Sequence, residues 1–278
     1  HVGDTVLRVE GLSLPRADQF GVDLVDLQFE VRAGEVVGIA GVSGNGQKEL
    51  LYALSGEDPR AQPAMVQLAG QSAGHLGPRQ RRRLGLHFVP EERLGRGAVP
   101  SMGLAHNLLL TRSDAVGSGG WIRMSVLQAQ ARGIIERFGV KAGGPDAAAQ
   151  SLSGGNLQKF IVGREISAQP RLLIVSQPTW GVDVGAAQQI RGEILALRDA
   201  GCAVLVLSEE LEELFDISDR MHVMAKGRMS PSVDRANATV ERIGEWMSGL
   251  WHGDVQAHLA RNRAQLAELN SGGAHAQT

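Results

Sequence analysis

Cysteine, tyrosine and net charge are scarce in this chain of 278 residues, which has one cysteine, one tyrosine and a formal charge of -2 at pH 7. The single cysteine, Cys202, excludes a disulfide framework and a cysteine-based metal site. Because it precedes the apolar run 203–207, we interpret it as a buried strand residue. The 28 Lys and Arg nearly balance the 30 Asp and Glu, so the chain lacks the basic surface of a protein that binds nucleic-acid phosphates. We therefore exclude DNA and RNA as main ligands.

Long apolar runs and a leader-like N-terminus are also missing. No stretch approaches the roughly 20 apolar residues of a membrane span. The first residues do not form the basic, apolar and small-residue pattern of a signal peptide. The sequence therefore predicts a soluble domain, and its start at His1 indicates that the natural N-terminal context is missing.

Neither the cluster of arginines nor the scattered histidines indicate a binding site. No aromatic residues are interleaved with the basic cluster, so we interpret it as a solvated face rather than a nucleic-acid site. The histidines have no paired spacing of the kind that forms a zinc site. The basic cluster consists of Arg79, Arg81, Arg82 and Arg83.

Glycine is abundant, with 36 residues, which indicates many tight turns. Apolar runs between Gly and Pro breaks predict strands in the first 40 residues. In the second half, apolar runs alternate with helical patterns, an order that predicts a parallel sheet covered on both faces. The expected strands are 6–9, 24–31, 36–40, 172–175, 203–207 and 221–225, and the expected helices are 185–199, 210–217 and 240–247.

The middle and the end of the chain follow other patterns. Residues 79–149 are helix-like, with a helix expected at 125–138, and we interpret this stretch as an inserted helical lobe. The polar segment 252–269 has spaced apolar residues, so it is expected to form a weakly amphipathic helix before a disordered end at 270–278.

The run GVSGNGQKEL, residues 41–50, follows an expected strand and opens an expected helix at 47–54. Successive backbone N–H groups in such a turn form an anion-binding nest at a helix N-terminus. The full nucleotide pattern places Lys and then Ser or Thr after the last glycine, whereas this chain has Gln47 and Lys48 there. Since one residue turns a helix by about 100°, Lys48 is expected to point away from the phosphate. A glycine-rich turn without a ligand is the alternative. The candidate binding residues are Gly41, Ser43, Gly44, Asn45, Gly46, Gln47, Lys48 and Glu49.

Two further motifs make the pattern specific. LSGGNLQK at 152–159 is followed by LLIVSQPTWGVDVGA at 172–186. With the phosphate loop, HFVPEERLGRG at 87–97 and VLVLSEELEELFDISDR at 204–220, they resemble the nucleotide-binding domain of ABC transporters. In this resemblance LSGGN is the signature motif, SQPT is in the Walker B position, GVD is the D-loop, and the other two segments are the Q-loop and the switch region. The details look most like the second of two tandem domains in ATPase subunits of simple-sugar and nucleoside importers.

The resemblance implies an α/β fold of the P-loop NTPase class. It would have a RecA-like parallel sheet core, an antiparallel β subdomain and an inserted helical subdomain at about 98–168. The ATP-binding domain would cover residues 4–248, and residues 249–278 would be a partly helical or disordered tail. The family's adenine-stacking aromatic is left unassigned, with Phe20 and Phe29 as candidates.

The chain departs from the family at the catalytic positions. Where the resemblance places the metal-binding aspartate, the catalytic glutamate and the switch histidine, the chain has Ser176, Gln177 and Glu209. Serine and glutamine carry no charge, so Ser176 would be at most a weak metal ligand and the attacking water would lack its base. Glu209 would place a carboxylate where the terminal phosphate lies, with Glu91 at the Q-loop position. We expect this site to bind nucleotide weakly or statically and to hydrolyse it poorly.

The signature motif, by contrast, is intact. In the family two domains enclose ATP head to tail, so the Ser153 hydroxyl and the backbone amides after it would contact the γ-phosphate held by a partner domain. Asp183 in the D-loop would support that interface, or would cap the helix that follows it. The candidate residues of this second surface are Ser153, Gly154, Gly155, Asn156 and Asp183.

These observations predict the energy-coupling domain of an importer for nucleosides or simple sugars. The resemblance implies ATP and Mg²⁺ as cofactors, and a second ABC domain, membrane permeases and, indirectly, a solute-binding protein as partners. The location would be peripheral, at the cytoplasmic face of the cell membrane. One alternative is a regulatory or scaffold module that binds nucleotide without hydrolysis. Another is a relative in DNA repair or translation, against which we count the lack of long coiled-coil insertions and basic linkers.

Overall fold

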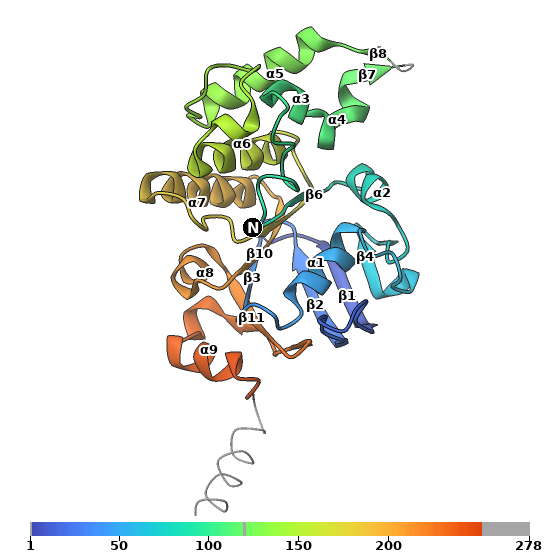
Figure 1. Ribbon diagram of the computed structural model, residues 1–278. Coiled ribbons are helices and arrows are strands. Elements are labelled where there is room, and N and C mark those ends of the chain that lie inside the picture. Colours follow the sequence, from blue (N-terminus) through green and yellow to red (C-terminus); the bar gives the residue numbers. More distant parts are fainter. Residues whose placement is uncertain (1, 119–120, 252–278) are drawn as a thin grey trace, which may run out of the picture.

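A mixed sheet forms the centre of the described part of the chain, which comprises residues 2–118 and 121–251 of a computed structural model (Figure 1). The strand order is β12-β11-β3-β10-β9-β6, with β13 paired to β11. The five strands from β11 to β6 run parallel, and the two short strands pair antiparallel with β11. The bounds are β3 Val36–Ala40, β6 Leu86–Val89, β9 Leu172–Ser176, β10 Ala203–Ser208, β11 Arg220–Ala225, β12 Arg228–Met229 and β13 Val233–Asp234.

A second, antiparallel sheet covers part of one face, with strand order β2-β1-β4-β5. Its strands alternate buried and exposed residues, as a sheet with one face toward the core requires. The bounds are β1 Thr5–Leu14, β2 Leu24–Arg32, β4 Val66–Leu68 and β5 Gln71–Ser72.

Helices complete the layers on both faces of the mixed sheet. Their bounds are α1 Gln47–Ser55, α2 Pro78–Arg83, α3 Leu104–Asn107, α4 Leu109–Val116, α5 Met124–Arg137, α6 Gly154–Ile166, α7 Val184–Asp199, α8 Leu211–Ile217 and α9 Val240–Met247. Short 3-10 turns lie at Pro63–Met65, Ala149–Ser151 and Arg235–Asn237. The predicted α/β fold with a parallel sheet core is confirmed.

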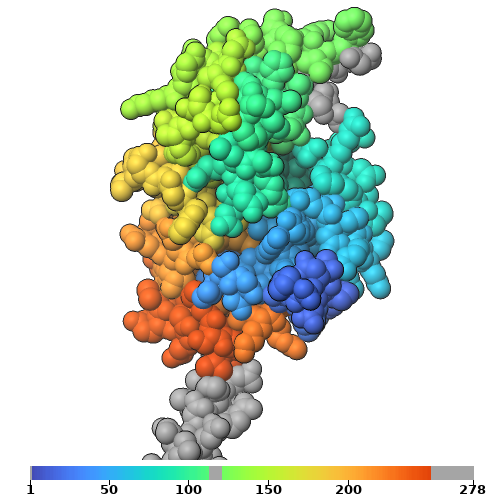
Figure 2. All heavy atoms as spheres, viewed as in Figure 1, coloured from blue at the N-terminus to red at the C-terminus, as the bar shows by residue number. Residues whose placement is uncertain are grey.

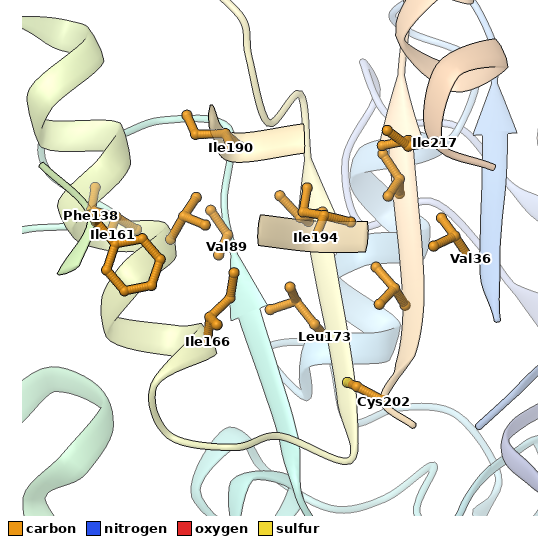
Figure 3. Close-up of a cluster of buried hydrophobic side chains, with 14 of the residues drawn as sticks. Val36, Val89, Phe138, Ile161, Ile166, Leu173, Ile190, Ile194, Cys202 and Ile217 are labelled. Atoms are coloured by element: carbon orange, nitrogen blue, oxygen red, sulfur yellow. The ribbon is translucent and has the colours of Figure 1, made fainter. Parts of the chain in front are cut away.

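Alternate residues of each central strand enter opposite apolar clusters, because side chains alternate along a strand. In β9, Leu173 belongs to the cluster beneath α6, α7 and α8, part of which Figure 3 shows, whereas Leu172 belongs to the cluster with α1 and the antiparallel sheet. The Cys202 thiol is buried in the first cluster, and this burial raises its pKa to about 12. The predicted burial of Cys202 is therefore confirmed, although the residue lies directly before β10 and not within it.

A helical lobe projects from one end of the mixed sheet, drawn in green and yellow-green in Figures 1 and 2. It consists of α3, α4, α5 and the first part of α6, with a two-stranded hairpin, β7 Gly117–Ser118 and β8 Trp121–Ile122. The prediction of a helix-like stretch at 79–149 was too broad, because that stretch also contains β6, an edge strand of the core sheet. The boundaries 98–168 and 4–248 stay predictions, and residues 252–278 of the expected tail lie outside the described residues.

Glu165, near the C-terminal end of α6, fixes the lobe to the core through a buried polar cluster. One carboxylate oxygen accepts hydrogen bonds from Arg164 and Thr111 at 2.7 Å each, and the other lies 2.6 Å from Nδ1 of His87 on β6. Burial opposes ionisation, but the charge of Arg164 and the hydrogen bond with His87 outweigh it and lower the pKa of Glu165 to about 2. The contact between Glu165 and His87 thus connects the lobe with β6, the strand that leads into the Q-loop.

Arg81 overturns part of the prediction of a solvated basic cluster. Its side chain is fully buried, and its guanidinium donates to the carbonyl oxygens of Ala53, Leu54, Gly74 and Leu76. Two of these carbonyls belong to the last turn of α1, where a helix has no internal donors left. Burial lowers the pKa of Arg81 to about 10. The arginine therefore caps a helix from inside the protein.

His222, on β11, is buried in a setting that favours the neutral ring. Its Nδ1 lies 3.0 Å from the Ser230 carbonyl oxygen, which can only accept, and its Nε2 lies 3.4 Å from the Arg220 guanidinium, which can only donate. Burial lowers the pKa of His222 to about 4, and the charge of Arg220 acts in the same direction.

Acidification is therefore expected to destabilise the fold through His222. The unfolded chain takes up this proton near pH 6.5 and the folded chain only near pH 4, so the stability is present above 6.5 and is lost toward 4. The loss amounts to at most about 3 kcal/mol. Urea unfolding at about pH 7 and about pH 5 checks this, because His222→Gln should show a smaller loss than the wild type. An equal loss in both proteins would contradict the prediction.

No helix in the described ranges is long and apolar enough to cross a membrane.

Candidate functional site

A cavity of about 430 Å³ opens at the carboxyl ends of β3, β9 and β10. This edge of a parallel sheet is the usual position of a ligand site. The cavity brings together twelve residues that the sequence singled out, although they come from five separate segments. They are Phe20, Gly41, Ser43, Gly44, Gly46, Gln47, Lys48, Glu49, Glu91, Ser176, Gln177 and Glu209.

The loop between β3 and α1 is held in place by Asn45. Its side-chain oxygen accepts from the Lys226 N–H at 2.9 Å, and its carbonyl oxygen accepts from the Gly227 N–H at 2.9 Å. Gly46 has φ 105°, and a Cβ there would lie 2.9 Å from the terminal carbon of Met224, so only glycine fits this turn. Asn45 thus acts through the loop backbone and is not among the residues that line the cavity.

The Gln47 side chain turns back and forms hydrogen bonds with the backbone of the loop. Its Oε1 accepts from the Asn45 N–H at 3.0 Å, and its Nε2 donates to the Val42 carbonyl oxygen at 2.8 Å. The Lys48 ammonium lies over the ring of Tyr52, one helical turn along, 5.6 Å from the ring centre. The Lys48 ammonium is therefore directed toward Tyr52 and away from the backbone N–H groups of the loop.

Glu209 contacts the same loop from the end of β10. Its Oε1 accepts from the Ser43 N–H at 2.5 Å. Its own N–H donates to Oε1 of Gln177 at 3.2 Å, and the Ser208 hydroxyl oxygen lies 3.3 Å from the same atom. Burial raises the pKa of the nearby Glu91 carboxyl, and the charge of Glu209 adds to this. The cavity thus has two carboxylates on the side where the switch and Q-loop segments meet.

A second buried carboxylate network lies behind these residues and was missed by sequence reasoning. The Glu213 carboxylate accepts from the Thr179 hydroxyl at 2.5 Å and from the Ser208 hydroxyl at 2.7 Å. Burial raises the pKa of Glu213, although both hydrogen bonds oppose this. Its sequence signal was only an acidic residue in a helical pattern, so nothing distinguished it from surface glutamates.

The two motif positions that would hold Mg²⁺ lack its usual ligands in this chain. Ser176 is buried and uncharged, and Lys48 stands where the nucleotide pattern has a hydroxyl ligand. Mg²⁺ is held through carboxylates, phosphates and water. Within residues 2–118 and 121–251, no group of three or more His, Cys, Asp or Glu side chains forms a metal site.

The signature motif lies apart from this cavity, at the N-terminus of α6. Ser153 is exposed and is the N-cap of that helix, and its hydroxyl oxygen accepts from the Asn156 side-chain amide at 2.9 Å. Asp183 is the N-cap of α7, where its carboxylate accepts from the Ala186 N–H at 2.9 Å. A Cβ on Gly155 would lie 3.1 Å from that carboxylate, so the two helix starts are packed closely. The helix-capping alternative for Asp183 is thus what the structure shows.

Arg93 joins these segments and was not singled out from the sequence. Its guanidinium donates to the carbonyl oxygen of Trp180, the residue directly before the D-loop. A Cβ on Gly154 would lie 3.3 Å from the same guanidinium. The Q-loop region, the signature and the D-loop therefore meet at one arginine.

Comparisons with known proteins identify the class of protein to which this fold and site belong. Residues 24–180 match the family model described as ABC transporter, and the chain belongs to this family. It is 41% identical over 252 residues to the glucose import ATP-binding protein TsgD13 of Haloferax volcanii, covering 89% of this chain and 45% of that protein. It is 38% identical over 250 residues to the guanosine import ATP-binding protein NupO of Bacillus subtilis, covering 89% and 48%. The chain spans about half the length of the curated relatives it matches.

Solved structures agree on the fold. A nucleotide-free ATP-binding cassette from an ABC transporter matches with a TM-score of 0.69 and 21% identity, over 83% of this chain and 92% of that one. The ADP conformation of the cassette MJ1267 matches with a TM-score of 0.68 and 21% identity, over 88% and 95%. The prediction of an ABC-type ATP-binding cassette is confirmed.

Proposed function

We propose that this chain is an ATP-binding domain of an importer for nucleosides or simple sugars. It would act as one of a pair of cassettes at the cytoplasmic face of the membrane, together with permease subunits and a solute-binding protein. The names of the relatives support the substrate classes, since TsgD13 is a glucose and NupO a guanosine import protein.

The division of labour within the proposed pair rests on one observation. The chain's own phosphate loop is contacted by its Gln47 and Glu209 side chains, whereas the start of α6 is exposed. The first surface would be poor at hydrolysis, because Gln177 cannot act as a base and Ser176 and Lys48 replace the usual Mg²⁺ ligands. The second surface would complete the ATP site of the partner cassette, which would supply the metal and the base.

The geometry of Ser153 suits this role. Its hydroxyl oxygen accepts the hydrogen bonds from Asn156, which leaves the hydroxyl hydrogen able to donate to an anion. The N–H groups of the first turn of α6 have no partner within the helix and carry the positive end of its dipole. A γ-phosphate held by the partner would therefore meet one hydroxyl and the amide donors of Gly154 and Gly155.

Hydrolysis of labelled ATP with Mg²⁺ by the purified chain, alone and with a competent partner cassette, tests the proposal. We expect no turnover above background for the chain alone, because the losses of base and metal ligand each cost about 10²-fold or more. The mixture should turn over faster than the partner alone. Turnover by the chain alone at the partner's rate would contradict the proposal. A mixture no faster than the partner would favour a non-hydrolytic regulatory module instead.

A further inference from the structure

The contact between Glu209 and Ser43 places a carboxylate on the phosphate loop itself. The two residues are 166 positions apart in the chain, and Oε1 of Glu209 lies 2.5 Å from the Ser43 N–H. A carboxylate that accepts a backbone N–H at an anion nest makes the same kind of charged hydrogen bond as a phosphate oxygen. The switch position of this chain therefore presents an anion of its own to the loop.

Only some of the backbone N–H groups of the loop have an acceptor within the protein. The Ser43 N–H donates to the Glu209 carboxylate, and the Asn45 N–H donates to the Gln47 side-chain oxygen. In the described part of the chain, the N–H groups of Gly44 and Gly46 donate to no protein acceptor. These two donors, in the loop and at the N-cap of α1, remain available to other phosphate oxygens.

The charges that line the cavity disfavour the binding of a terminal, third phosphate group. Glu209 and Glu91 both line the cavity and repel each other, and the three lining cations are directed elsewhere. Lys48 lies over an aromatic ring. Arg60 is paired with Asp58 at 2.8 Å, and Arg96 is paired with Glu57 at 2.7 Å. No cation of the lining is therefore placed to neutralise a terminal phosphate beside Glu209.

Resting on the proposed function, we propose that Glu209 is a specificity residue that substitutes for the terminal phosphate, so that this cavity binds ADP in preference to ATP. The carboxylate fills the end of the loop and repels a third phosphate, while the Gly44 and Gly46 donors stay available to a diphosphate. Discrimination comes from this repulsive element, not from an added attraction to ADP. The site would then retain a diphosphate through the cycles of the partner site.

Isothermal titration calorimetry of the chain with ADP and with ATP in EDTA tests the inference, because the chelator prevents turnover and keeps both nucleotides free of metal. We expect the wild type to bind ADP at least about tenfold more tightly than ATP. Glu209→Gln keeps the shape and the acceptor but removes the charge, and Glu209→Ala removes both. Each should strengthen ATP binding by about tenfold and change ADP binding by less than about threefold.

Glu212→Gln is the matched control, since it removes the same charge from an exposed position that does not line the cavity. It should leave both affinities unchanged, and melting curves of each variant should show that it is folded. The inference fails if the wild type binds ATP as tightly as ADP, if it binds neither, or if the Glu209 variants change both nucleotides equally. A chain that does not hydrolyse ATP but binds the two nucleotides equally would contradict this inference alone. Turnover in Mg²⁺ by the chain alone would contradict the proposed function.

Discussion

Gly154→Asp in this chain is expected to lower ATP turnover of the assembled pair by about 100-fold or more, because it removes an anion site made of preorganised donors. Gly154 is the first residue of α6, directly after the N-cap Ser153, and it is exposed. A carboxylate there would occupy the start of the helix and repel the γ-phosphate held by the partner. The measurement is Mg²⁺-dependent hydrolysis by the pair, with the substitution confined to this chain.

The fold should tolerate this change, which makes the result interpretable. An acidic residue in the first turn of a helix stabilises it by about 0.3–1 kcal/mol, so the melting temperature should not fall. The neighbouring group is the guanidinium end of Arg93, which can move. Val240→Asp is the matched control, because it places the same carboxylate at the first position of α9, after the N-cap Thr239. Unchanged turnover in Gly154→Asp would mean that this helix start does not meet the partner's nucleotide.

Much of the fold could be predicted because it depends on local pattern. The expected strand 172–175 and helix 185–199 became β9 Leu172–Ser176 and α7 Val184–Asp199, since apolar periodicity and glycine breaks act over a few residues. The strand β6 was not predicted, because it lies within the stretch that was interpreted as helix-like. It is only four residues long, and it belongs to the sheet through pairing with β9, which lies far along the chain.

The candidate site could be predicted as a set of positions but not as a set of contacts. The motifs placed Glu209 near the phosphate loop, yet its hydrogen bond to Ser43 depends on side-chain geometry that no spacing encodes. Arg81 was misjudged for a related reason. A run of arginines looks solvated until the carbonyl groups that one of them caps are known, and those groups come from another helix. Long-range polar contacts therefore limit prediction from a single sequence more than the apolar core does.

Replacement of Glu165 by leucine is expected to cost about 3–5 kcal/mol of unfolding free energy, because it leaves the buried Arg164 guanidinium without its charged partner. Arg164 is buried beside the carboxylate, and His87 approaches its other oxygen at 2.6 Å. Glu165→Gln keeps the shape and the acceptor for Arg164 and Thr111, so it should cost less than half as much. Urea unfolding at about pH 7 measures both losses.

A second comparison separates charge from packing. In Arg164→Met with Glu165→Leu, both charges are gone and the volumes are similar, so part of the stability should return. A loss below about 1 kcal/mol for Glu165→Leu alone would contradict the buried pairing. The cluster matters for function because α6 has the signature at its first residues and Glu165 at its second-last residue, about 17 Å away along the helix. Loosening the far end of this helix should therefore also lower turnover of the pair, although no residue near the signature has changed.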